Sequence, residues 1–120
     1  MTINELIRKL NTEPGHIDFA EVIDTIENAY HYTPTCFRNG TGNKAVINEA
    51  GCNEGSCKIL SFGKINNLNE QQTLACFGKY YREDVLNHPN HDDHANIRNF
   101  ILQGWQGIRF EGDALSPKDS

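Results

Sequence analysis

The sequence predicts a mainly α-helical fold, a compact bundle of about five helices with long ordered loops and at most a short two-stranded β piece. Three observations favour this class. Five segments carry apolar residues at the three- and four-residue spacing of an amphipathic helix. A length of 120 residues is enough to bury one core, and 38% hydrophobic with 22% charged residues is a globular balance. We therefore expect residues 1–113 to form a single helical domain and residues 114–120 a flexible C-terminal tail.

The first two helices are predicted from their start signals and their apolar stripes. Thr2 and Glu5 have the spacing of a capping box, and the helix that follows should last two to three turns before Pro14 and Gly15 end it. Asp18 should begin the second helix. The inward residues are Ile3, Leu6, Ile7 and Leu10 in the first helix and Phe19, Val22, Ile23, Ile26 and Tyr30 in the second.

Residues 30–42 break the helical pattern and predict a long ordered loop. Pro34 disfavours a helical conformation for the residue before it, and the Asn-Gly pair at residues 39–40 favours a tight turn. A short strand is expected at residues 45–47. Residues 109–111 could form an extended piece that pairs with it.

The third and fourth helices are predicted around two asparagine-rich junctions. The third should run from about residue 55 to residue 65, where Asn66 and Asn67 stop it. Asn69 and Gln72 then have capping-box spacing, and the fourth helix should be the longest, ending before Pro89. The inward residues are Ile59, Leu60 and Ile65 in the third helix and Leu74, Phe77, Tyr81 and Val85 in the fourth.

A fifth helix is predicted after a polar connector. Asp92 or Asp93 should cap it, and Gly104 with Gly107 should weaken its last turns so that it ends early. The inward residues of this helix are Ile97, Phe100, Ile101, Trp105 and Ile108.

Charge and hydropathy limit the partners and the compartment. The net charge is −5 and the eleven basic residues are scattered, which argues against nucleic acid or an anionic membrane as a partner. No apolar run approaches the roughly 20 residues that span a bilayer, and the N-terminus lacks the layout of a signal peptide. We expect a soluble cytoplasmic chain with reduced thiols. The four cysteines are Cys36, Cys52, Cys57 and Cys76.

The segment from residue 48 to residue 58 is the main candidate site. Its glycines and asparagines indicate a shaped loop that leads into the third helix. A helix start leaves about four backbone N–H groups without internal partners, of which Asn53 or Ser56 can cap one or two. The others could face an anion, a thiolate or water. The predicted ligand-binding residues are Asn48, Asn53, Gly55, Ser56 and Lys58, together with Tyr32 and Asn39 from the preceding loop.

Cys57 is a candidate catalytic residue. It lies in the predicted first turn of the third helix, where the helix dipole and the neighbouring Lys58 would lower the pKa of its thiol. A nucleophilic or redox role would then need a base, for which His94 or His31 is available. The alternative, which base rates favour, is a small apolar residue that fills the core.

The connector before the fifth helix raises the question of a metal site. His88, His91 and His94 are spaced by three residues, with Asp92 and Asp93 among them, so two imidazoles and a carboxylate could meet one metal ion. A solvated polar connector is the alternative. We favour the connector and expect neither a metal nor another cofactor.

The central segment also carries a family resemblance. It reads Asn-x-Ala-Gly-x-Asn-x-Gly-Ser-Cys-Lys over residues 48–58, and similar matches occur at residues 32–35, 77–86 and 93–110. In these positions the chain resembles the HopJ type III effectors, over most of its length beyond the first helix. Extra residues around 41–45 depart from the family pattern. The resemblance implies a bacterial, virulence-related, HopJ-like domain of unknown biochemical activity.

Two functions remain open from the sequence. The leading hypothesis is a binding or interaction module that presents the region from Tyr30 to Cys57 to an unknown protein or a small anionic ligand. The alternative is a small thiol-dependent enzyme or anion-binding protein centred on Cys57. We expect the bacterial cytoplasm as the location, and secretion into host cells is implied by the family name alone.

Overall fold

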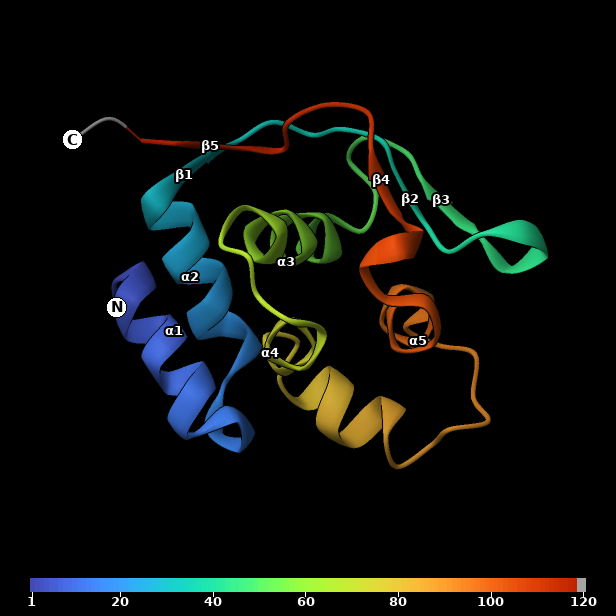
Figure 1. The fold of residues 1–120 in the computed structure, drawn as a ribbon, viewed down its shortest axis with the longest axis horizontal. Coiled ribbons are helices and arrows are strands. Elements are labelled where there is room, and N and C mark those ends of the chain that lie inside the picture. Colours follow the sequence, from blue (N-terminus) through green and yellow to red (C-terminus); the bar gives the residue numbers. More distant parts are fainter. Residues whose placement is uncertain (119–120) are drawn as a thin grey trace.

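The computed structural model describes residues 1–118 and shows five α-helices with two small antiparallel sheets (Figure 1). The helices are α1 (Ile3–Thr12), α2 (Phe19–Ala29), α3 (Glu54–Ile65), α4 (Glu70–Ala75) and α5 (Ala95–Gln103). The strands are β1 (Tyr30–Tyr32), β2 (Phe37–Asn39), β3 (Val46–Asn48), β4 (Ile108–Phe110) and β5 (Leu115–Pro117). The mainly helical class is confirmed, but a two-stranded β piece underestimates the sheets.

Three helices begin at the residues that the sequence predicts, and each start has a capping box, which the sequence analysis named for α1 and α4. In each one the side chain of the third helical residue accepts the N–H of the residue at the N-cap, at 2.9 Å. The pairs are Thr2 with Glu5 for α1, Asp18 with Glu21 for α2, and Asn69 with Gln72 for α4. These starts depend on residues three positions apart, so local sequence is enough to predict them.

The prediction of a loop over residues 30–42 is wrong at residues 30–32 and 37–39, which form β1 and β2. β2 is the central strand of a three-stranded sheet, with β3 on one side and β4 on the other. Phe37 faces Phe110 of β4 and Asn48 of β3 across this sheet. The extended pieces at residues 45–47 and 109–111 are therefore real to within one residue, but each pairs with β2 and not with the other.

The end of the chain is better held than predicted. β5 pairs with β1, placing Tyr32 opposite Leu115, and Ala114 and Leu115 are 2% and 4% exposed. Part of the expected tail is therefore built into the fold, because residues 115–117 form a paired strand and the apolar side chains of Ala114 and Leu115 lie in the core. Residues 119–120 of that predicted tail lie outside the described part of the chain.

The predicted long fourth helix is interrupted at Gly78. α4 has only six residues, and the chain then turns through Gly78, whose φ is +60°. A Cβ atom at Gly78 would lie 2.7 Å from the backbone nitrogen of Phe19, so only glycine allows this approach to the start of α2. A π-helical segment, Tyr80–Val85, follows, with the N–H of Leu86 bonded to the carbonyl of Tyr81 at 3.0 Å.

The residue at the N-cap of α5 is His94, and not an aspartate. His94 has a φ of +53°, whereas Asp93 binds Arg98 at 2.6 Å. The early end is confirmed, because the helix stops at Gln103 and Gly104 has a φ of +63°.

Most predicted inward residues form one hydrophobic core between the helices and the sheets. Phe37, Phe62 and Phe100 are its largest fully buried side chains. Ile65 and Ile101 are exceptions, at 45% and 43% exposed. Among residues 1–118, none of the helices has both the length and the apolar content that crossing a membrane requires.

Candidate functional site

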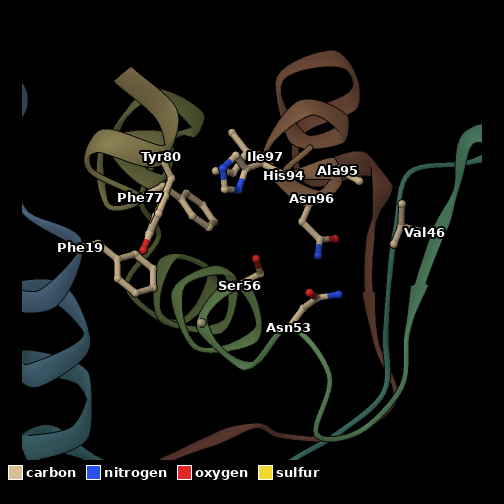
Figure 2. A pocket seen from close by; sticks show the side chains of 11 residues that line it. Phe19, Val46, Asn53, Ser56, Phe77, Tyr80, His94, Ala95, Asn96 and Ile97 are labelled. Carbon is tan, nitrogen blue, oxygen red and sulfur yellow. The ribbon is translucent and has the colours of Figure 1, made fainter. Parts of the chain in front are cut away.

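An open pocket of about 440 Å³ lies where α3 and α5 begin (Figure 2). We call it the α3–α5 pocket. Its lining residues are Phe19, Val46, Asn53, Gly55, Ser56, Phe77, Tyr80, His94, Ala95, Asn96 and Ile97. Aromatic side chains from α2 and the segment after α4 form one wall, and polar side chains from the two helix starts form the other. The pocket therefore combines an apolar surface with hydrogen-bonding groups, as ligand sites commonly do.

Both helices enter the pocket through a residue in the left-handed conformation. Asn53 before α3 has a φ of +51°, and His94 before α5 has a φ of +53°. Asn and His are among the residues that tolerate this conformation best. Within residues 1–118, neither side chain caps its own helix. The first intrahelical bonds are made by the N–H groups of Cys57 and Arg98, so the N–H groups before them have no acceptor inside their helices.

The side chain of Asn53 belongs instead to a ladder of four asparagines. Asn53 Nδ2 donates to Asn48 Oδ1 at 2.6 Å, and Asn96 Nδ2 donates to the same oxygen at 2.9 Å. Asn48 Nδ2 donates to Asn96 Oδ1 at 3.1 Å, and Asn39 Nδ2 donates to the Asn96 carbonyl at 2.8 Å. This asparagine ladder ties β2 and β3 to the starts of α3 and α5.

The ladder changes the role expected for two predicted ligand residues. Asn39 and Asn48 are 0% and 1% exposed, and they lie behind the pocket among the strands. Their amides hold the two helix starts in place and present no free surface to a ligand. Asn96, which the sequence did not single out, is the link between this scaffold and the pocket wall.

His94 is held at the pocket by an acidic partner. Its Nε2 lies 3.0 Å from Asp84 Oδ2 and 3.7 Å from Asp93 Oδ2, and its ring centroid lies 5.3 Å from that of Tyr80. When Nε2 carries the proton and donates it to Asp84, Nδ1 is an acceptor; when the imidazole is charged, both nitrogens donate. His94 is 29% exposed, so it can respond to a bound ligand and to solvent.

Cys57 does not take part in this site. It is 1% exposed, and it is absent from the residues that line the pocket. Burial raises the pKa of its thiol, and this outweighs the hydrogen bonds from Tyr32 and from the backbone of Thr35 that would lower it. The predicted lowering of the pKa by the helix start is therefore wrong, and the alternative interpretation of Cys57 as a core residue describes its surroundings.

Tyr32 and Lys58 lie together, outside the pocket. Lys58 Nζ is 2.9 Å from Glu27 Oε2 and 4.7 Å from the centroid of the Tyr32 ring. Burial, followed by the neighbouring Glu54 and Cys57, raises the pKa of the Tyr32 hydroxyl. The positive charge of Lys58 is thus already paired, and it is not available to the α3–α5 pocket.

The remaining cysteines and histidines lie outside the α3–α5 pocket. All four cysteines are free, and the rings of His88 and His91 stack with centroids 4.6 Å apart. In the part of the chain that the structure describes, no group of three or more His, Cys, Asp or Glu residues is arranged to hold a metal ion.

Four of the nine predicted site residues, Asn53, Gly55, Ser56 and His94, meet in the pocket. Sequence reasoning missed Phe19 and Phe77, which form the aromatic wall of the pocket together with Tyr80. Phe19 and Phe77 carry an ordinary helical pattern of core residues, so their place at a pocket could not be told from the sequence. Gly55 is required by the same wall, because a Cβ there would lie 2.8 Å from the Phe19 ring, a contact that no local pattern contains.

The fold and the pocket define a small, mainly helical α/β protein whose open site lies between two helix starts. The chain belongs to the HopJ type III effector protein family, whose model matches residues 3–115. It is similar to a solved crystal structure of a protein of unknown function, VPA0580, with 47% sequence identity and a TM-score of 0.93. That similarity covers 98% of this chain and 95% of the other. The comparison with curated proteins gave no match.

Proposed function

We propose that this HopJ-family protein acts by binding, and that the α3–α5 pocket takes a small ligand with an anionic group. The observation that carries the proposal is the meeting of two helix starts, neither capped by its own side chain, in one pocket among the described residues. Backbone N–H groups and the positive ends of both helix dipoles favour negative charge at this place. The hydroxyl of Ser56 adds one side-chain donor, and the imidazole of His94 adds a second when it is charged and both of its nitrogens donate.

The opposite wall of the pocket supports a ligand that also has an apolar part. The rings of Phe19 and Tyr80 pack edge to face with centroids 5.1 Å apart. Phe19 reaches this position because Gly55 has no side chain to obstruct it. An aromatic or aliphatic group of the ligand would be buried against these rings while its anionic group faces the helix starts.

Acidic neighbours set the expected strength of binding. Asp84 already accepts from His94, and Asp93 lies close to the same ring. A ligand anion would compete with Asp84 for the imidazole, in a chain of net charge −5. We therefore expect weak binding that falls with added salt and strengthens in the variant Asp84→Asn.

A thiol-dependent enzyme is not proposed, because no feature of the structure favours it. The broader binding hypothesis for the region from Tyr30 to Cys57 is narrowed to the pocket, since residues 30–32 and 37–39 are paired strands. The family description supports the further proposal that the protein is delivered into host cells by a type III system. A reporter enzyme fused to the chain, with and without a working secretion apparatus, would test delivery.

The binding proposal is tested by titrating isotope-labelled protein with inorganic phosphate and with benzoate. We expect amide NMR shifts at Gly55, Ser56, Ala95 and Asn96, and loss of these shifts in Ser56→Glu, which places a carboxylate in the same space. Lys58→Gln is the matched control, because Lys58 lies outside the pocket and should leave the shifts unchanged. Shifts spread over other surfaces, or equal shifts in Ser56→Glu, would refute the proposal.

A further inference from the structure

The α3–α5 pocket adjoins a second hollow, an open groove of about 570 Å³ beside α5. Val46 and Ala95 line both hollows. We call the second hollow the α5 groove; its apolar residues beyond these two are Val85, Leu86, Pro89, Ile101 and Leu102. Ala95 is exposed and carries only a methyl group, so the surface between the two hollows is low and apolar.

The α5 groove concentrates apolar surface that the fold leaves in water. Leu86, Ile101 and Leu102 are 52%, 43% and 67% exposed, and they are three of the seven large hydrophobic residues that are exposed among the described residues. Ile101 lies on the stripe that the sequence predicts to face inward. A contiguous apolar surface of this kind commonly marks a binding site.

The charged residues of the groove do not provide a second anion site as good as the pocket. Arg98 is committed to the Asp93 carboxylate at 2.6 Å and to the backbone carbonyls of His88 and Asp93. Lys44 and Asp92 also line the groove, and their opposite charges offset each other. The free donors at the starts of α3 and α5 therefore favour the pocket for an anionic group, and the groove favours an apolar one.

We propose that one ligand occupies both hollows: a carboxylate with an unbranched alkyl chain. Its carboxylate would lie in the α3–α5 pocket, and its chain would cross Ala95 and lie in the α5 groove against Leu86, Ile101 and Leu102. This inference rests on the proposed function and names the ligand class for the same site. The observation that carries it is that the two hollows share Val46 and Ala95 in their linings.

The test is a titration of the full chain with butanoate, hexanoate, octanoate and decanoate below their micellar concentrations. Each added methylene that is buried should lower the dissociation constant about two- to fourfold. Ala95→Phe, which fills the passage between the two hollows, should remove the dependence on chain length. Leu102→Asp, on the exposed rim, should weaken decanoate binding about tenfold or more and leave butanoate unchanged. The matched control is Ile65→Asp, which makes the same kind of change at an exposed apolar residue of α3 outside both hollows.

The outcomes separate this inference from the proposed function. Butanoate and phosphate that bind the pocket, with no gain from longer chains, would overturn the amphiphile and leave the anion site in place. Failure of every anion to shift the pocket amides would refute both. Decanoate binding that survives Ser56→Glu but is lost in Lys44→Gln would place the carboxylate in the groove and overturn the orientation proposed here.

Discussion

Two groups of helices differ in how side chains bond the backbone N–H groups at their starts. The first group is α1, α2 and α4, and the second is α3 and α5. The first three are closed by capping boxes, in which the N-cap residue and the third helical residue each bond the other's backbone N–H group. Within the described residues, the other two begin at a left-handed Asn53 or His94 whose side chain bonds elsewhere. A good cap is worth about 1 kcal/mol, so leaving two helices without one has a stability cost. The comparison shows that the chain gives up local helix stability where α3 and α5 meet the pocket.

The largest effect should come from breaking the scaffold behind the open helix starts. Asn48→Ala removes the acceptor for Asn53 and Asn96 and leaves buried amide groups unpaired, so we expect the free energy of unfolding to fall by about 2 to 3 kcal/mol. Urea denaturation measures this. Asn43→Ala, at an exposed turn, is the control and should change stability by less than about 0.5 kcal/mol. An equal loss of stability in both variants would show that the asparagine ladder does not stabilise the fold.

A closed helix start should be less sensitive. Asn69→Ala removes the side chain that accepts from the N–H of Gln72 at 2.7 Å, and the expected loss is about 1 kcal/mol. Thermal and urea denaturation both measure it. Gln71→Ala, an exposed position in the same helix, should leave stability unchanged or slightly higher. No loss in Asn69→Ala would show that the capping box adds nothing to α4.

Closing an open helix start should raise stability and remove binding together. Ser56→Glu places a carboxylate in the first turn of α3, and we expect the free energy of unfolding to rise by about 0.3 to 1 kcal/mol. The same variant should lose the phosphate-induced shifts described above. Ser56→Ala separates charge from size and should leave stability nearly unchanged. A clear loss of stability in Ser56→Glu would mean that the pocket cannot admit a carboxylate.

The smallest effect concerns acid and the closed start of α2. Burial alone would raise the pKa of Glu21, but Lys9 at 2.9 Å and the N–H of Asp18 lower it below the ordinary 4.5. The stabilisation from this carboxylate is therefore present above pH 4.5 and is lost as the pH falls through the lower folded value. Urea denaturation at pH 6.5 and at about pH 3 should show a smaller acid-induced loss in Glu21→Gln than in the natural chain. Glu13→Gln, outside these contacts, should behave like the natural chain.

Local patterns in the sequence were enough to predict the closed helix starts and most of the core, because three- and four-residue spacings decide both. β1, β2 and β5 were missed, and the pairing of β3 and β4 was wrong, because each strand has three residues and is fixed by partners far along the chain, such as Phe110 for Phe37. The break at Gly78 depends on its contact with Phe19, which no local pattern contains. In the site, Asn53, Gly55 and Ser56 were found from turn chemistry. Asn96 was missed because only the ladder defines its role.

Cys57 also shows why a position in the first turns of a helix does not by itself make a thiol reactive. The sequence places Cys57 in the first turns of α3, where a dipole acts on any side chain that faces the helix end. The structure turns its sulfur into the core, where loss of water outweighs that field and raises the pKa. Ser56, one residue earlier, faces the pocket instead.

The asparagine ladder has a consequence for how quickly and how selectively a partner can associate. Its amides are neutral and share hydrogen bonds among two strands and two helices, so the donors at both helix starts keep fixed positions relative to each other. Such preorganisation removes most of the entropy that a flexible loop would lose when it closes around a guest. We therefore expect the same backbone conformation with and without a ligand, and we expect the selectivity among ligands to depend on their shape.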